Sequence, residues 1–199
     1  MLWAGIDVGA RRKGFHVCAI DEAGLVAGVD VIRGERAAEG VVEWITGLPD
    51  RPRVIAIDAP SELAPPGATR RPGEAVFQAK VCSLYPTPSP ETFEARLDSH
   101  YEWIREGLDA WRLLRPSGIE LVECFPTASW LRWHGPKQGR SRAAWSTAAL
   151  AEHGLEALPE RRNQDVRDAI GAALTARAWS RGEAERIGCI VVPFAPVSA

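Results

Sequence analysis

Short apolar runs alternate with polar segments along the first part of the chain. The runs at 2–7, 15–20 and 25–32 are separated by turn-forming segments rich in Gly and charged residues. This spacing is typical of strands joined by tight turns. We therefore predict an antiparallel meander of three strands at the start of the chain.

The rest of the pattern mixes buried strands with helices. Two runs, 54–58 and 119–124, are mostly apolar, as expected of strands covered on both faces. Apolar residues at helical spacing predict helices at 35–48, at about 92–115, after Pro126, at 142–153 and at 164–181. Residues 189–193 add a short final strand. This alternation of strands and helices predicts a layered α/β fold with a mixed sheet.

The segment from about 60 to 95 is rich in Pro and Gly, and only 75–81 has a helical pattern. A loop of this length inside a compact domain is usually functional or mobile. The chain of 199 residues contains no internal repeat. We expect one domain, 1–199, with an excursion at about 60–95.

Composition narrows the class of protein. Hydrophobic residues make up 46% of the chain. The formal net charge of −2 argues against a nucleic-acid binder whose whole surface is basic, but it is compatible with a local basic cleft. No apolar run is long enough to cross a bilayer, and the opening run is too short for a signal peptide, so we expect a cytoplasmic protein. The four cysteines are far apart, which indicates reduced core residues rather than a zinc site.

Candidate chemistry lies in carboxylates at the ends of the predicted elements. Three of them close strand-like runs and two open the last helix: Asp7, Asp58, Glu123, Asp165 and Asp168. Each also has a structural explanation, because Asp often caps helices or begins turns. A carboxylate that directly follows a buried strand is nevertheless costly to bury without a partner.

The order of the strands can bring these acids together. If 54–58 lies parallel to and beside 2–7, Asp7 and Asp58 occupy neighbouring carboxyl ends, where open α/β sheets bind ligands. Converging carboxylates repel one another unless a cation lies between them. Carboxylate oxygens suit Mg²⁺ or Mn²⁺, and a pair of such ions can drive phosphodiester hydrolysis. We expect Asp7, Asp58 and Asp168 to bind the metal, with Glu123 or Asp165 as the fourth ligand.

Basic residues follow several of the acidic segments. Arg11 and Lys13 come just after Asp7, Arg71 lies in the excursion, and Lys137 and Arg140 lie between two predicted helices. Basic side chains near a metal centre could hold a phosphate backbone. Any single one could equally belong to a solvated turn.

The motifs resemble a known family over nearly the whole chain. They occur in the order GIDVG, KGFHVCAID, AIDAPSELAPPG, RRPGE, VECFPTASWL, KQGR and DVRDAIGAALTA. This order resembles the predicted nucleases catalogued as domain of unknown function 429, which are assigned a ribonuclease H-like fold. The resemblance implies an acidic metal centre at Asp7, Asp58, Glu123 and Asp168, with Asp165 nearby. Arg71 in RRPGE and Lys137 and Arg140 in the KxG-type stretch also match the family's pattern.

The sequence therefore predicts a metal-dependent nuclease that acts on DNA or RNA with Mg²⁺ or Mn²⁺. One alternative is a phosphotransferase of the sugar-kinase and actin-like class, since Asp7-Val8-Gly9 fits its first strand turn. The chain is short for that class, and no second glycine-rich phosphate loop is visible. A second alternative is a non-catalytic nucleic-acid-binding protein of the same fold. Trp-rich helices could also form the face of a homodimer.

Overall fold

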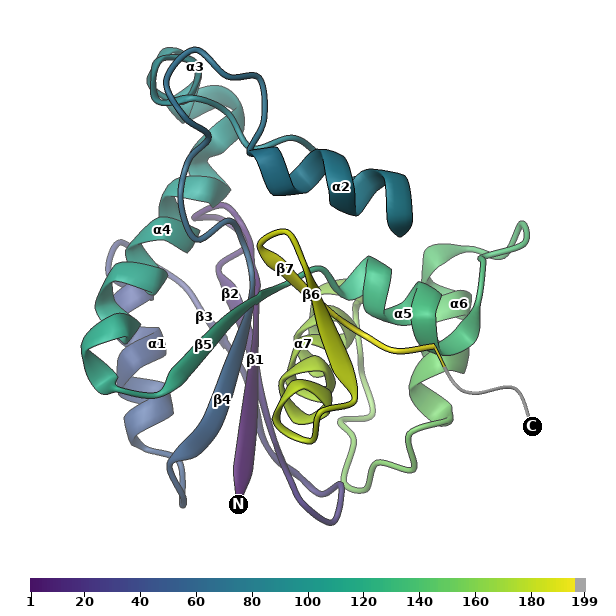
Figure 1. The fold of residues 1–199 in the computed structure, drawn as a ribbon. Helices are drawn as coiled ribbons and strands as arrows, with labels where there is room; N and C mark the ends of the chain where they lie inside the picture. Colours follow the sequence, from purple (N-terminus) through teal and green to yellow (C-terminus); the bar gives the residue numbers. More distant parts are fainter. Residues whose placement is uncertain (196–199) are drawn as a thin grey trace.

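The fold is organised around a seven-stranded sheet with strand order β3-β2-β1-β4-β5-β7-β6 (Figure 1). The computed structural model describes residues 1–195, without the side chains of residues 98 and 99. The strands are β1 (Leu2–Val8), β2 (Phe15–Asp21), β3 (Val26–Ile32), β4 (Pro52–Asp58), β5 (Glu120–Cys124), β6 (Ala184–Ile187) and β7 (Ile190–Pro193).

Strands β1, β2 and β3 form the predicted antiparallel meander. Strand β4 lies parallel to β1, and β5 lies parallel to β4, so the sheet is mixed as expected. Strand β7 adds in parallel to β5 and carries β6 as an antiparallel edge strand. The sequence did not predict β6, because this four-residue strand contains two charged residues and has no apolar alternation.

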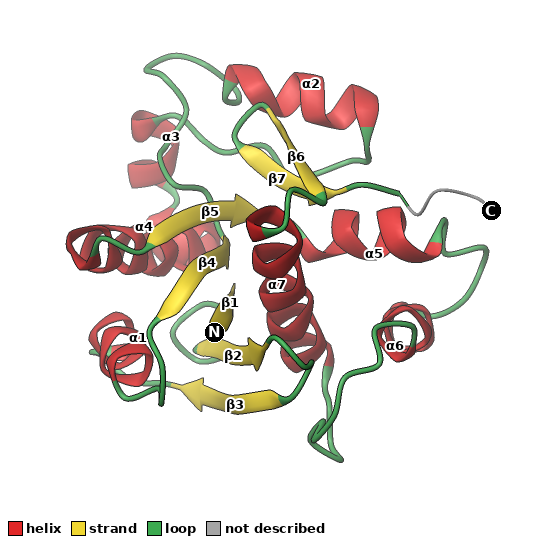
Figure 2. Ribbon diagram, turned by 60° about the horizontal axis from the view of Figure 1, so that its bottom comes forward, coloured by secondary structure: helices red, strands yellow, loops and turns green. Residues whose placement is uncertain are grey.

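Helices cover both faces of the sheet (Figure 2). They are α1 (Ala37–Thr46), α2 (Pro72–Lys80), α3 (Pro90–Ala95), α4 (Glu102–Leu114), α5 (Pro126–His134), α6 (Arg142–Ala151) and α7 (Gln164–Ser180). Helices α1 and α4 pack on one apolar core, and α5, α6 and α7 pack on the other. Within the described part of the chain, no helix is long and apolar enough to span a membrane.

The helix predicted at about 92–115 is divided in the structure. It consists of α3, a π-helical turn at Leu97–Tyr101, α4 and a final 3₁₀ turn at Arg115–Ser117. The break falls at Arg96, whose φ of −132° and ψ of 18° are not helical. The prediction of one helix was wrong, because no Pro or Gly marks this position in the sequence.

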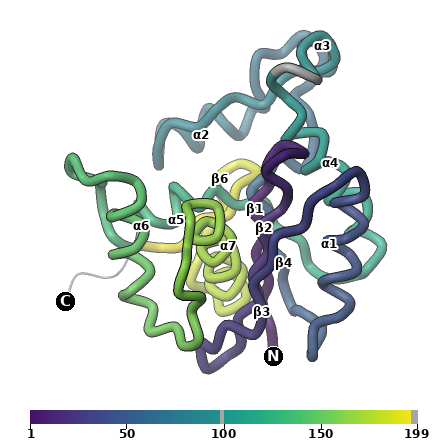
Figure 3. Tube along the Cα trace, turned by 180° about the vertical axis from the view of Figure 1, so that it is seen from behind, coloured from purple at the N-terminus to yellow at the C-terminus, as the bar shows by residue number. Residues whose placement is uncertain are grey.

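The excursion lies over the carboxyl ends of the central strands, where α2 and α3 form a cover (Figures 1 and 3). Helix α2 begins at Pro72, a favourable first helical residue. Its Gly73 packs directly on the β6–β7 turn, because a Cβ there would lie 2.7 Å from the Cα of Gly188. The excursion is therefore docked on the sheet through its backbone.

Helix α7 is the main support of the central strands. A Cβ at Gly5 in β1 would lie 2.1 Å from the backbone nitrogen of Ala173 and 2.3 Å from the carbonyl oxygen of Ala169. Only glycine allows the helix and the strand to approach so closely. This contact places the first turn of α7 beside the carboxyl end of β1.

Candidate metal centre

Asp7 and Asp58 are neighbours in the sheet. They are paired in the parallel register of β1 and β4, each near the carboxyl end of its strand. Adjacent strands lie about 4.8 Å apart, so two paired side chains on the same face are in reach of one ion. The prediction that these two carboxylates occupy neighbouring strand ends is confirmed.

Both side chains point to the face that α7 covers. Side chains alternate along a strand, so Asp7 shares a face with Trp3, and Asp58 shares a face with Val54 and Ala56. Trp3, Val54 and Ala56 belong to the apolar core that packs against α7. The acids at the start of α7 therefore lie on the same side of the sheet as Asp7 and Asp58.

Burial and repulsion from nearby acids disfavour the charged forms of Asp7 and Asp58. Burial raises the pKa of Asp7 well above its usual value, and repulsion from Asp58, Asp168 and Asp165 raises it further. The pKa of Asp58 is raised by burial and then by repulsion from Asp168. Among the described residues, none donates a hydrogen bond to either carboxylate. A cation between them would remove this repulsion.

His16 is a second unpartnered group at the same place. It lies opposite Asp7 in the pairing of β1 with β2, and its Nδ1 is 3.9 Å from Oδ2 of Asp7. The ring is only 2% exposed, and neither of its nitrogens has a hydrogen-bond partner among the described residues. Burial lowers the pKa of His16, which favours the neutral ring. A buried polar group without a partner indicates a missing ligand or water.

Asp168 is surrounded by donors, unlike Asp7 and Asp58. Its Oδ1 accepts from Nε1 of Trp130 at 3.0 Å and from Nε2 of Gln164 at 2.9 Å, while its Oδ2 accepts from Arg142 at 2.8 Å. Gly171 makes room for the indole, because a Cβ there would lie 2.4 Å from the ring of Trp130. Burial still raises the pKa of Asp168, although Arg142 opposes the shift.

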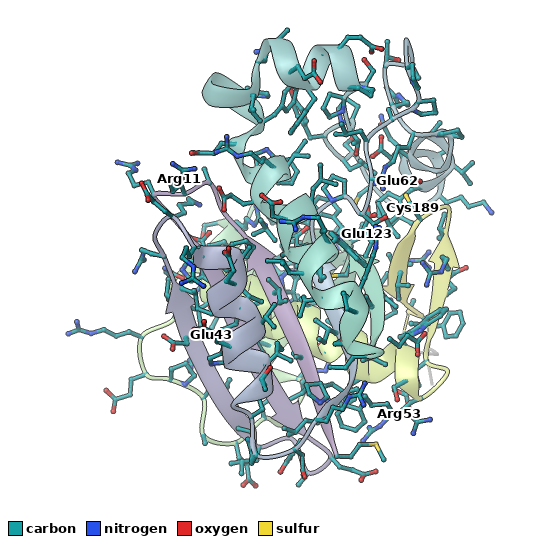
Figure 4. The ribbon with its side chains drawn as sticks, turned by 90° about the vertical axis from the view of Figure 1, so that its left-hand side faces the viewer. Arg11, Glu43, Arg53, Glu62, Glu123 and Cys189 are labelled. Atoms are coloured by element: carbon teal, nitrogen blue, oxygen red, sulfur yellow. The ribbon has the colours of Figure 1, made fainter. Side chains whose placement is uncertain are left out.

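Glu123 is held in a different environment. It pairs in register with Ile57, one residue before Asp58, so alternation turns it toward the opposite face of the sheet. Its carboxylate accepts two hydrogen bonds from the guanidinium of Arg71, at 2.8 and 2.5 Å, and one from the backbone of Ser61 at 3.1 Å. Figure 4 shows Glu123 beside Cys189, with Arg11 farther away in the β1–β2 turn.

The Arg71–Glu123 pair is part of a buried network that fastens the excursion to β5. Arg71 is 4% exposed, and its Nε also donates to Glu74 at 3.0 Å. Glu74 in turn accepts hydrogen bonds from the hydroxyl and the backbone nitrogen of Thr87. Arg71 was expected to bind substrate; in the structure each of its guanidinium nitrogens donates a hydrogen bond to Glu74 or Glu123, and the residue also lines the cleft beneath the excursion.

We expect Arg71→Ala to destabilise the protein by about 3–5 kcal/mol, because it leaves two buried carboxylates without their cation. For a chain of this length, each kcal/mol corresponds to a shift of about 2–4 °C in Tm. Arg70→Ala is the matched control, since Arg70 is half-buried and, among the described residues, its side chain donates a hydrogen bond to the amide oxygen of Gln78, at 3.3 Å, and not to a carboxylate. Thermal unfolding of both variants checks this. Equal Tm values would show that the buried network contributes little.

The other predicted basic residues differ in their partners and in their exposure to solvent. Nζ of Lys13 is 3.1 Å from Asp165, so this acid, too, has a cation as its partner. Arg11 lies 3.9 Å from carboxylates of α4 and is half-exposed. Lys137 is exposed, and Arg140 donates to Nε2 of His134 at 2.7 Å. Arg142, which donates to Asp168, was not among the residues that match the family's pattern.

The structure thus divides the predicted acids into two groups. Asp7 and Asp58 lie together without a donor or a cation at bonding distance, whereas each of the other three is paired with a basic side chain: Glu123 with Arg71, Asp165 with Lys13 and Asp168 with Arg142. As the side chains stand in residues 1–195, no three His, Cys, Asp or Glu residues form a ready metal site. The paired aspartates and the orphaned His16 nevertheless offer the donors that a hard divalent cation accepts.

A cleft leads to this centre from the side of the excursion. Its lining includes Asp58 and Glu123 and the aromatic side chains of Tyr85, Trp103 and Phe125. The cleft connects the acids with the space beneath the excursion. A substrate that reaches Asp58 from this side contacts the excursion as well as the sheet.

Comparison with known proteins gives the same fold. "T. thermophilus RuvC in complex with Holliday junction substrate" matches with a TM-score of 0.54 and 16% identity, over 92% of this chain and 96% of that chain. "Thermus thermophilus RuvC structure" matches with a TM-score of 0.53 and 17% identity over the same shares. The chain therefore has a ribonuclease H-like fold. A search of curated proteins finds no match.

A sequence-family model also matches nearly the whole chain. The model of the family described as "Protein of unknown function (DUF429)" matches residues 5–189. This range includes all the acids and bases considered above. The chain belongs to the DUF429 family.

Proposed function

We propose that this protein is a nuclease that uses a divalent metal ion to hydrolyse phosphodiester bonds in nucleic acid. The observation that supports this most strongly is the pair of neighbouring carboxylates, Asp7 and Asp58, whose pKa values are raised by burial and by repulsion from nearby acids. Burying two unpaired acids side by side is costly without a cation. The RuvC structure in complex with a Holliday junction supports nucleic acid as the substrate class.

In this proposal, Asp7 and Asp58 hold Mg²⁺ or Mn²⁺, and Asp168 becomes a further ligand through Oδ2. His16 supports Asp7 from β2, either as a ligand or as a hydrogen-bond donor to its carboxylate. Bound ions of this kind activate water and neutralise the leaving oxygen of a phosphodiester. Glu123, which remains paired with Arg71, and Asp165 add negative charge near the ion.

The basic residues have two roles in the proposal. Arg11, Lys137 and Arg140 are the side chains that contact phosphates of the backbone, together with Lys13 when it leaves Asp165. Arg71 positions Glu123 and the excursion, because its guanidinium is buried between two carboxylates. An acidic protein can bind nucleic acid in this way, since only the local field at the cleft has to be positive.

A nuclease screen tests the proposal. Single-stranded and double-stranded DNA, RNA, RNA–DNA hybrid and a four-way DNA junction are incubated with Mg²⁺, with Mn²⁺ and with a chelator. We expect cleavage of at least one substrate with either metal and none with the chelator. Saturable metal binding without cleavage of any substrate would favour a non-catalytic binding protein. Stabilisation by ATP and Mg²⁺, but not by oligonucleotides, would favour a phosphotransferase.

A further inference from the structure

Among the described residues, Arg142 is the one exposed donor to a buried acid of the centre. Asp168 is held by Trp130 and Gln164 on Oδ1 and by Arg142 on Oδ2. The indole of Trp130 is fully buried. The side chain of Arg142 is 49% exposed, whereas that of Asp168 is 3% exposed. Of the three donors, Arg142 is therefore the one that can leave without opening the core.

The charge of Arg142 acts on more than one acid. It lowers the pKa of Asp168 against the effect of burial, and it does the same for Asp58. Asp58 has no hydrogen-bond donor of its own among the described residues. The guanidinium therefore supplies part of the positive charge that a divalent ion would bring to the centre.

The position of Arg142 allows its side chain to turn outward. It is the first residue of α6, after the N-cap Ser141, whose hydroxyl accepts from the backbone nitrogen of Ala144. The cap fixes the backbone, so only the side chain has to rotate. The N-terminal end of a helix is electropositive, and Lys137 and Arg140 lie in the preceding loop. The electropositive end of α6 and these two basic side chains favour the binding of a phosphate group by the outward-turned guanidinium.

An independent observation indicates that a ligand belongs next to these acids. His16 is 98% buried, both of its ring nitrogens lack a partner among the described residues, and Nδ1 is 3.9 Å from Oδ2 of Asp7. An ion at Asp7 and Asp58 would lie beside this ring. It would also compete with Arg142 for Oδ2 of Asp168.

We propose that Arg142 is an exchangeable counter-ion of Asp168. In the metal-free protein its guanidinium occupies Oδ2 of Asp168. When Asp7 and Asp58 bind a divalent ion, Oδ2 of Asp168 coordinates the ion in place of its hydrogen bond with Arg142. The released guanidinium then binds a phosphate oxygen of the nucleic acid. This inference rests on the proposed function and adds that metal loading exposes a binding residue for the substrate.

A permanent positioning role for Arg142 gives the opposite expectation. If the guanidinium had to stay on Asp168 to orient it, its removal would weaken metal binding. If it exchanges, its removal frees an oxygen for the ion and strengthens metal binding. The sign of the change in Mn²⁺ affinity therefore separates the two roles.

The test is a Mn²⁺ titration by calorimetry on the full chain, with wild type, Arg142→Gln and Arg140→Gln. Arg140→Gln is the matched control, because it removes the same charge from a side chain that contacts His134 and backbone carbonyls instead of an acid. We expect Arg142→Gln to bind Mn²⁺ about three- to ten-fold more tightly than Arg140→Gln, as for loss of a half-exposed charged hydrogen bond. Equal or weaker binding overturns the proposal. Thermal unfolding confirms that both variants are folded.

A second arm measures the affinity for a fluorescent oligonucleotide in Ca²⁺, with intact substrate verified on a gel. We expect Arg142→Gln to bind the oligonucleotide about three- to ten-fold more weakly than wild type in Ca²⁺, and equally well in a chelator. Equal affinities in Ca²⁺ overturn the exchange. If wild type cleaves nucleic acid but neither arm changes, only the role of Arg142 fails. If wild type binds no Mn²⁺ at all, the proposed function fails as well.

Discussion

The Asp58→Asn variant is expected to lose metal-dependent cleavage while its metal-free form becomes more stable than wild type. Cleavage should fall by about 10³-fold or more, because the ion supplies several kcal/mol of transition-state stabilisation. Stability should rise because the variant removes a buried carboxylate that two other acids repel. Each kcal/mol gained corresponds to about 2–4 °C in Tm.

The gain in stability should depend on pH. Asp58 has a folded-state pKa above its unfolded value of 3.8. A carboxyl whose pKa is raised by folding does not lower the free energy of unfolding at pH values below its unfolded-state pKa. The destabilisation grows as the pH rises from there toward the folded-state pKa. The difference in Tm between Asp58→Asn and wild type is therefore largest at neutral pH and vanishes below about pH 4.

The control for this prediction is Asp30→Asn, an exposed aspartate on β3 whose Oδ1 accepts from the backbone nitrogen of Val31. It should cleave like wild type and show the wild-type Tm. Metal-dependent cleavage and thermal unfolding in a chelator are the two measurements. Full cleavage by Asp58→Asn would remove Asp58 from the mechanism, and a lower Tm would show that its charge is already compensated.

The second large effect is expected for Gly5→Ala. A methyl group at this position would overlap the backbone of α7, with contacts of 2.1 and 2.3 Å, and backbone atoms cannot rotate away. We expect a loss of about 3 kcal/mol or more, which is the upper range for overpacking. Because α7 must shift, Asp165 and Asp168 also move away from Asp7, and Mn²⁺ affinity should fall.

Gly28→Ala provides the matched strand control. A Cβ there would lie 3.3 Å from a ring atom of Trp44, and no backbone atom lies in its way. This variant should be as stable as wild type or slightly more stable, since Ala costs less conformational entropy than Gly. Urea unfolding of both variants checks the prediction. A Gly5→Ala protein as stable as Gly28→Ala would contradict the close contact between α7 and β1.

The sequence was sufficient for the parts of the fold and site that depend on local pattern. Each acid that ends an apolar run marks the end of a strand, which is why the neighbouring positions of Asp7 and Asp58 could be predicted. The meander strands are apolar runs bounded by turn-forming residues, the last helix is a long segment without Pro, and all of them appear close to their predicted bounds. Strand β6 was missed because its residues carry no such pattern.

The partners of the acids could not be predicted in this way. His16 reaches Asp7 through strand pairing, and its lack of partners is visible only once both faces are packed. The contact between Arg71 and Glu123 joins residues 52 positions apart, and that between Arg142 and Asp168 joins residues 26 positions apart. Such contacts depend on how helices dock on the sheet, which single-sequence periodicity does not specify.

The most direct test is a Mn²⁺ titration of wild type, Asp7→Asn, Asp58→Asn and Asp30→Asn in the absence of nucleic acid. If the two strand-end carboxylates share an ion, wild type and Asp30→Asn show the same saturable binding, and both Asp7→Asn and Asp58→Asn lose it. Binding of undiminished affinity in Asp7→Asn and Asp58→Asn would show that these acids do not form a metal centre.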